Sequence, residues 1–177
     1  MQDKDALSKL QSLFSKNALK RQVNDPFCCP LCGNEYPGQE FTNGNKEYYQ
    51  WCTVCDRQKL VEKFGSWTSG NEVLDQFIQL TQLESKWYHS YVEWAEPEEF
   101  VNITHLADGG FGSVYKANWS KGWRTVLGIE HRRPEKWLLK VGRSRNYEVV
   151  LKTLNLGDTV SAEFLNEVSI NMTLHFV

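Results

Sequence analysis

Cys29-Pro30-Leu31-Cys32-Gly33 and Cys52-Thr53-Val54-Cys55 decide how the first third of this 177-residue chain folds. Each stretch is a C-x2-C knuckle, and the 19 residues between the knuckles fit the spacing of structural zinc sites. Such a turn can point both sulfurs to one side, and Gly33 permits the positive backbone dihedral that it often needs. We therefore expect the thiolates of Cys29, Cys32, Cys52 and Cys55 to surround one Zn²⁺ ion, about 2.3 Å from each sulfur.

The double knuckle resembles a zinc ribbon, and two other uses of the cysteines stay open. The thiols could be free core residues, or a redox pair, although neither pair follows a βαβ pattern. Cys28 is ambiguous, because it would give a C-x3-C spacing if it replaced Cys29 as a ligand. Four thiolates leave no open coordination position, so the metal is expected to support folding and to take no part in catalysis.

The composition predicts a folded, soluble chain, and the mixture of helix and strand patterns predicts an α+β fold. The lack of an export signal predicts that the protein stays inside the cell, in the cytoplasm. The chain is 41% hydrophobic and 24% charged, and its net charge of −2 gives no general reason to bind phosphate backbones. No apolar run is long enough for a membrane span or a secretory signal, so no membrane partner is expected. In a reducing compartment, metal ligation is the favoured use of the five cysteines.

The chain divides into four segments by pattern and charge. Residues 1–22 read as an amphipathic helix, and residues 23–66 as the zinc-ribbon-like module, with a hairpin turn at Asn43-Gly44. Residues 67–98 read as an acidic connector helix that starts with the capping box Ser69-x-x-Glu72 and runs to about Trp94. Residues 99–177 alternate short strands and turns and end in a helical pattern from about Ser161.

A glycine-rich turn stands between two strand candidates, 100–106 and 113–119. It reads Leu106-Ala107-Asp108-Gly109-Gly110-Phe111-Gly112-Ser113-Val114-Tyr115. Its strand flanks distinguish it from Rossmann and Walker loops, which open a helix, and its backbone N–H groups could approach phosphate oxygens. Taken alone, it could equally be an ordinary glycine hairpin. A third strand candidate, 147–154, contains Val149-Val150-Leu151-Lys152, and Glu167 follows on the helical pattern.

Together the loop, the lysine and the glutamate resemble the small lobe of protein kinases. The resemblance implies that Lys152 contacts the α- and β-phosphates of ATP and that Glu167 pairs with Lys152, although Glu163 is a competing partner and Lys140 a rival lysine. It also implies that the nucleotide lies against the loop, with Phe111 at its tip and Val114 over the adenine. The ATP-binding set is Leu106, Ala107, Gly109, Gly110, Phe111, Gly112, Val114 and Lys152.

The order of motifs extends the resemblance over nearly the whole chain. C-x2-C, W-C-x2-C, W-T-S-G-N, E-W, G-G-F-G-S-V-Y-K-A and F-L-N-E look like a large fungal family of zinc-ribbon-headed kinases of the tyrosine-kinase-like type, within the Ser/Thr kinase superfamily. The resemblance implies a small four-cysteine ribbon, a connecting helix and a partial kinase small lobe of antiparallel strands plus the αC helix.

Several departures from that family limit the expected activity. Ala107 takes the first glycine position and Val150 the alanine position, so ATP affinity is expected to be weak or vestigial. Residues 121–145 are an insertion, expected to be a solvated basic loop that could dock an acidic partner. The sequence ends at Val177 within the small lobe, without H-R-D or D-F-G, so no phosphoryl transfer is expected and ATP with Mg²⁺ belongs to a complete kinase only.

The alternative function is a non-catalytic interaction module. In that hypothesis the ribbon and the acidic helix bind a protein partner, and the kinase motifs are vestigial. Binding of nucleic acid by a surface of Tyr49, Trp51, Arg57, Lys59 and Lys63 is a third hypothesis, which the net acidic charge of the ribbon segment disfavours.

Overall fold

The computed structural model of the chain describes residues 25–109 and 112–153, which form an α+β fold with two helices and two β-sheets. The predicted helices over 1–22 and from Ser161 lie outside the described residues. The elements are β1 (Gly38–Glu40), β2 (Lys46–Tyr49), α2 (Cys55–Val61), α3 (Glu72–Glu84), a short 3-10 turn (Pro97–Glu99), β3 (Phe100–Gly109), β4 (Gly112–Trp119), β5 (Trp123–Arg133), β6 (Lys136–Ser144) and β7 (Tyr147–Lys152).

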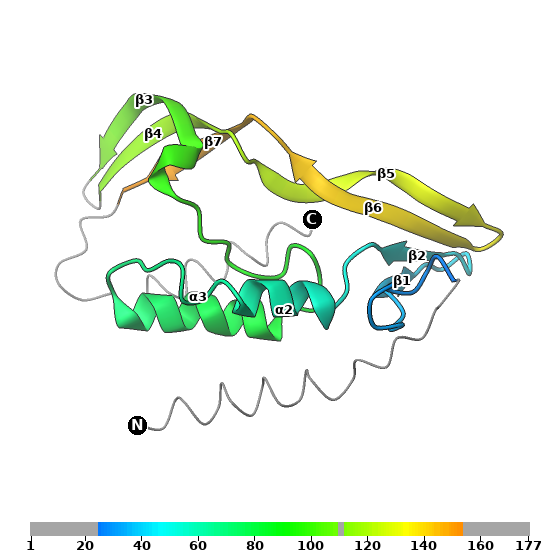
Figure 1. The fold of residues 1–177 in the computed structure, drawn as a ribbon. Coiled ribbons are helices and arrows are strands. Elements are labelled where there is room, and N and C mark those ends of the chain that lie inside the picture. Colours follow the sequence, from blue (N-terminus) through cyan, green and yellow to red (C-terminus); the bar gives the residue numbers. More distant parts are fainter. Residues whose placement is uncertain (1–24, 110–111, 154–177) are drawn as a thin grey trace, which may run out of the picture.

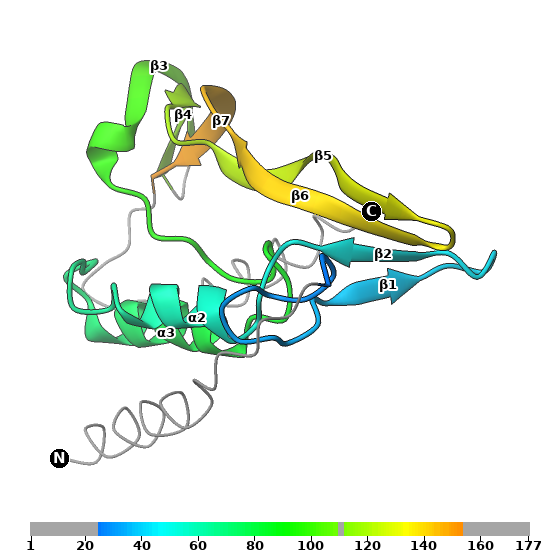
Figure 2. The same cartoon turned by 45° about the vertical axis from the view of Figure 1, so that its right-hand side comes forward.

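A four-stranded sheet joins segments that are far apart in the sequence, in the order β1-β2-β6-β5. Strands β1 and β2 form an antiparallel hairpin, and its turn contains Gly44 at a φ of 80°, as Asn43-Gly44 predicts. Strand β6 then pairs in parallel with β2 and antiparallel with β5 (Figure 2). The sheet is therefore mixed, with two strands from the predicted ribbon and two from the predicted insertion.

The prediction of a solvated loop over residues 121–145 is wrong, because most of this segment forms the long β5–β6 hairpin. Two apolar residues of β6 explain why. Leu138 is 2% exposed and Leu139 is 8% exposed, so both sides of this strand bury apolar surface. Leu138 packs in the same core as Phe27 and Tyr48 of the ribbon. Burial of a leucine stabilises by about 1.5–3 kcal/mol, which favours the paired strand over a solvated loop.

The second sheet has three antiparallel strands in the order β3-β4-β7 (Figure 1). These strands confirm the three strand candidates of residues 100–119 and 147–154, although β3 extends to Gly109 and β7 ends at Lys152. The β5–β6 hairpin lies between β4 and β7 in the sequence, and β4 and β7 pair directly with each other. The glycine turn thus connects two neighbouring strands of one antiparallel sheet.

Helix α3 is shorter than the sequence predicts and has a different N-cap. The side chain of Asn71 accepts hydrogen bonds from the Val73 and Leu74 amides, whereas the Ser69 hydroxyl donates to Asp75 at 2.5 Å. The helix ends at Glu84 and not near Trp94. The following chain turns back, because the buried Gln82 side chain donates to the Val92 carbonyl at 2.9 Å.

The two helices form a layer below the sheets, where α2 packs on α3 (Figure 1). Arg57 of α2 donates to the Ser85 carbonyl at the end of α3, at 2.6 Å. The chain after α3 is joined to the β5–β6 hairpin by ion pairs of Glu93 with Arg143 of β6 and with Lys121, which lies just before β5. No helix in the described part of the chain has the length and hydrophobicity to cross a bilayer.

Candidate metal centre and glycine hairpin

The first knuckle is a tight turn that backbone hydrogen bonds hold closed. The Cys29 amide donates to the Asn34 carbonyl and the Gly33 amide donates to the Cys29 carbonyl, both at 2.8 Å. Gly33 has a φ of 78°, the conformation for which glycine was predicted at this position. This turn places Cys29 and Cys32 on the same side of the loop, and Cys29 is buried.

The second knuckle leads directly into helix α2, which starts at Cys55. The Cys55 amide donates to the Cys52 sulfur at 3.3 Å, and the Cys52 amide donates to the Asp56 carboxylate at 2.7 Å. This short helix was not predicted. Asp56 just inside its start was the available signal, because a carboxylate in the first turn favours a helix N-terminus.

The two knuckles bring four sulfurs together. Those of Cys29, Cys32, Cys52 and Cys55 all lie within 4.8 Å of one another. The Cys32 and Cys52 sulfurs are 3.4 Å apart, close to the roughly 3.8 Å between two thiolates that share a tetrahedral Zn²⁺ ion. Cys28 is not part of this group, and its amide donates to the Asp25 carbonyl. The four cysteines can therefore hold a metal ion.

The thiols of this group influence one another's protonation. Burial raises the pKa of Cys52 to about 12, and burial together with the neighbouring thiols raises the pKa of Cys55. Burial works against ionisation of Cys32 too, but hydrogen bonds from the Asn34 amide and from Cys52 lower its pKa. A cation would offset the repulsion among four thiolates, and the protons that they lose would be released on metal binding. A soft all-sulfur donor set of this kind suits Zn²⁺.

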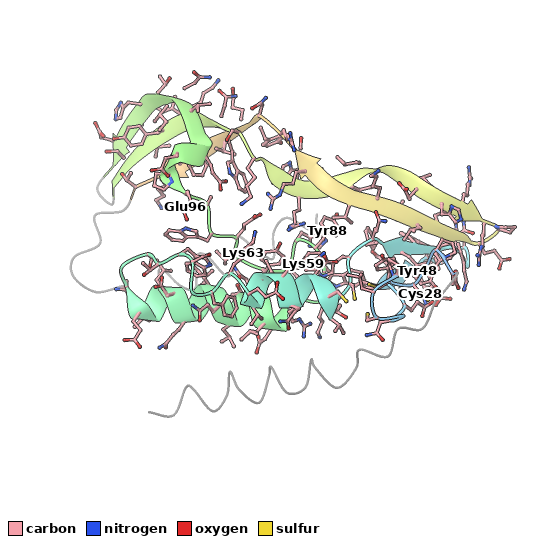
Figure 3. The ribbon with its side chains drawn as sticks, viewed as in Figure 1. Cys28, Tyr48, Lys59, Lys63, Tyr88 and Glu96 are labelled. Atoms are coloured by element: carbon pink, nitrogen blue, oxygen red, sulfur yellow. The ribbon has the colours of Figure 1, made fainter. Side chains whose placement is uncertain are left out.

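The surroundings of the sulfurs come from both halves of the sequence. Phe27, Tyr36 and Tyr48 are buried beside the buried cysteines, and Leu138 of strand β6 completes the same cluster. In Figure 3 the labels of Cys28 and Tyr48 mark this end of the molecule, and Lys59 lies on helix α2. The β5–β6 hairpin thus contributes Leu138 to the core beside the candidate metal centre.

The predicted nucleotide residues lie in the second sheet as far as the structure describes them. Ala107 of β3 pairs with Val114 of β4, and Val114 pairs with Lys152 of β7. Directly paired residues project from the same face, so these three side chains form one row across the sheet. Gly109 pairs with Gly112 at the end of the hairpin, and Leu106 is 52% exposed. Gly110, Phe111 and Glu167 lie outside the described residues.

Asp108 braces the hairpin on the opposite face, a role that sequence reasoning missed. Its carboxylate accepts a hydrogen bond from the Ser113 hydroxyl at 2.6 Å and contacts His105 Nε2 at 2.8 Å. These bonds, first the one from Ser113, lower the pKa of Asp108. Ser113 and Thr153 are joined by backbone and side-chain bonds, including Thr153 N–H to Ser113 O at 2.8 Å. The carboxylate of Asp108 is thereby kept on the face away from Lys152.

Two other lysines are candidates for a phosphate contact, and their positions differ. Lys116 pairs with Val150, which places it on the same face as Lys152, and it forms an ion pair with Glu148 at 2.6 Å. Lys140, the rival in the sequence, lies in the other sheet and pairs with Glu130 at 3.5 Å. The structure thus separates Lys140 from the glycine hairpin and places Lys152 beside it.

The aromatic and basic residues of the nucleic-acid hypothesis do not form one surface. Trp51 is 2% exposed and stacks on Tyr91, with ring centroids 5.7 Å apart. Tyr49 is half-buried and contacts Trp87, and the amine of Lys59 pairs with Asp56 at 2.8 Å. Trp51 is thus a core residue, and Tyr49 is partly covered by Trp87, so the two rings do not form a stacking platform together.

Comparison of the chain with family models, curated proteins and solved structures finds no match. The interpretation of both sites therefore rests on their geometry and on the sequence motifs.

Proposed function

We propose that the four-cysteine cluster is a structural zinc site of the zinc-ribbon type. The observation that carries the proposal is the convergence of four sulfurs within 4.8 Å, from two knuckles closed by backbone hydrogen bonds. Cys29, Cys32, Cys52 and Cys55 would hold the ion, which would tie the first loop to helix α2. Structural zinc supplies folding energy directly, so the ribbon is expected to depend on it.

Metal analysis of the purified chain tests the zinc proposal. We expect one zinc ion per chain, and loss of that zinc in Cys52→Ser. Cys28→Ser is the matched control, because Cys28 is the neighbouring thiol outside the cluster, and it should keep the metal. A chain without bound metal after purification in zinc-containing medium, or a Cys28→Ser variant that alone loses it, would contradict the assignment.

We also propose that the second sheet is the first part of a protein-kinase small lobe, from the fungal zinc-ribbon-headed kinases that the motifs resemble. Its support is the row of Ala107, Val114 and Lys152 beside the glycine hairpin. Val150 shares that face and is 67% exposed, so an adenine ring could lie against Val114 and Val150 while Lys152 contacts phosphates. Glu167 would be the partner of Lys152 on the following helix.

The proposal covers weak nucleotide binding and no phosphoryl transfer. Neither H-R-D nor D-F-G occurs in the 177 residues, so this chain supplies no catalytic base and no magnesium ligand of the kinase type. A titration with a fluorescent ATP analogue should give a dissociation constant in the millimolar range. Lys152→Met should weaken it about tenfold, a loss typical of one phosphate contact.

Lys116→Met is the matched control, since Lys116 lies on the same face and is already paired with Glu148. Equal losses in both variants would show that only general positive charge attracts the nucleotide. An absence of binding in the folded wild-type chain would refute the nucleotide proposal and favour the alternative, a non-catalytic zinc-ribbon interaction module. The exposed apolar residues Val73 and Leu80 on α3 favour that alternative as well.

A further inference from the structure

Three cationic side chains stand side by side across one end of the four-stranded sheet. Arg133 of β5 pairs with Lys136 of β6, and Lys136 pairs with Lys46 of β2. Directly paired residues in adjacent strands project from the same face, with their Cβ atoms about 5 Å apart. Arg133, Lys136 and Lys46 therefore form one continuous row of positive charge, which we call the cation row.

Two buried aromatic rings hold the cation row in place. The amines of Lys46 and Lys136 lie 4.9 and 5.6 Å from the centre of the Tyr48 ring, and the Arg133 guanidinium lies 5.1 Å from that of Phe27. The two rings meet edge to face at 5.0 Å. Cations are attracted to ring faces, so this pair of rings keeps the three charges together at the rim of the metal centre.

Acidic residues lie at both ends of the cation row. Asp25 pairs with Arg133 at 3.4 Å, and Glu40 of β1 lies opposite Lys46. Among the described residues, the ion pairs include neither Lys46 nor Lys136, although a bond with Tyr48 and the charges of Glu35 and Glu40 raise the pKa of Lys46. Like charges directly opposite each other destabilise a sheet, and a bound anion would relieve this repulsion.

A recess of about 480 Å³ adjoins the row at the tip of the hairpin. The Arg132 guanidinium lies 5.0 Å from the centre of the Trp137 ring there, and this cross-strand pair projects from the face of the sheet opposite to the cation row. The recess is lined by Asn45, Arg132, Arg133, Pro134, Glu135 and Trp137. An anionic side chain that entered it would meet two guanidinium groups, which suit carboxylates, and one opposing carboxylate, that of Glu135.

We propose that the cation row and this recess bind a short acidic peptide segment of a partner protein. Asp25 and Glu40 at the ends of the row limit the site to a compact cluster of carboxylates. A long polyanion such as nucleic acid would be repelled by these acids and by a chain of net charge −2. The site lies on the ribbon and the inserted hairpin, so it does not depend on nucleotide binding at Lys152.

Fluorescence anisotropy with a fluorescein-labelled hexaglutamate peptide tests the proposal on the full chain. We expect saturable binding that weakens with salt and that falls about tenfold or more when Lys46→Gln and Lys136→Gln are combined. Lys140→Gln is the matched control, because Lys140 lies on the same strand outside the row and pairs with Glu130. It should bind the peptide as the wild type does.

Three results would overturn the proposal: equal affinity in the double variant, equal binding of a hexaglutamine peptide, or tighter binding of oligothymidylate with the same number of charges. The last would make the row a nucleic-acid contact. Far-UV circular dichroism reports whether the double variant is folded. If it is not, Arg132→Gln decides, since Arg132 lies away from the buried rings. It should weaken hexaglutamate binding at unchanged melting temperature, and unchanged affinity in that variant would refute the site.

Discussion

Replacement of Leu138 by alanine tests whether the inserted hairpin and the metal centre fold as one unit. Leu138 is 2% exposed and packs in the cluster that contains Phe27, Tyr48 and Cys29. Truncation of a buried leucine costs about 2–5 kcal/mol. If the cysteine cluster binds zinc as proposed, and only in the folded state, a loss of about 2 kcal/mol should lower the apparent zinc affinity about thirtyfold when the metal-free ribbon is unfolded.

A competition titration against a chromophoric zinc chelator measures this affinity. If the ribbon folds without zinc, the melting temperature of the metal-free chain measures the loss of stability instead. Ile129→Ala is the control, since Ile129 lies on the adjacent strand β5 and is 54% exposed. The reasoning fails if Leu138→Ala changes neither the zinc affinity nor the melting temperature more than Ile129→Ala does.

Three further predictions concern the remainder of the fold. Gly122→Ala should lower the free energy of unfolding by about 2–4 kcal/mol in urea denaturation, because the φ of Gly122 is +67° and an added Cβ would lie 1.7 Å from the Ser144 carbonyl oxygen. Gly65 has open space around it, so Gly65→Ala should leave the stability nearly unchanged. Asn71→Ala should lower stability by about 1 kcal/mol through loss of the helix cap, and a variant as stable as wild type would refute that role. Burial opposes ionisation of Asp75, but hydrogen bonds from Ser69 and Thr68 lower its pKa. The stabilising effect of the Asp75 carboxylate should therefore be complete above about pH 4 and disappear as the pH falls through the lowered pKa. The melting temperatures of wild type and Asp75→Asn should converge in acid, and a constant difference would contradict this.

The sequence could predict what local chemistry determines. Knuckle spacing indicated which cysteines approach one another, and Asn43-Gly44 indicated the β1–β2 turn. The alternation of residues around the glycine turn indicated β3 and β4. In each case the interacting residues are close in sequence, or they follow a known spacing of metal-binding cysteines.

The remainder depends on partners far away in the sequence. Trp137-Leu138-Leu139 reads as an apolar strand, but nothing in it indicates parallel pairing with residues 46–49. Helix α3 ends early because Gln82 and Thr81 bond to the backbone of Val92, and such a reversal leaves no periodic signal. Helix α2 was missed because it is only seven residues long.

The parallel contact between β2 and β6 has a consequence for limited proteolysis. A cut in the exposed turn between α2 and α3 divides the polypeptide before the second sheet begins, yet the two pieces still share one four-stranded sheet and one cysteine-lined core. The nicked molecule should therefore elute from a sizing column at the volume of the intact one, and its fragments should separate only after denaturation.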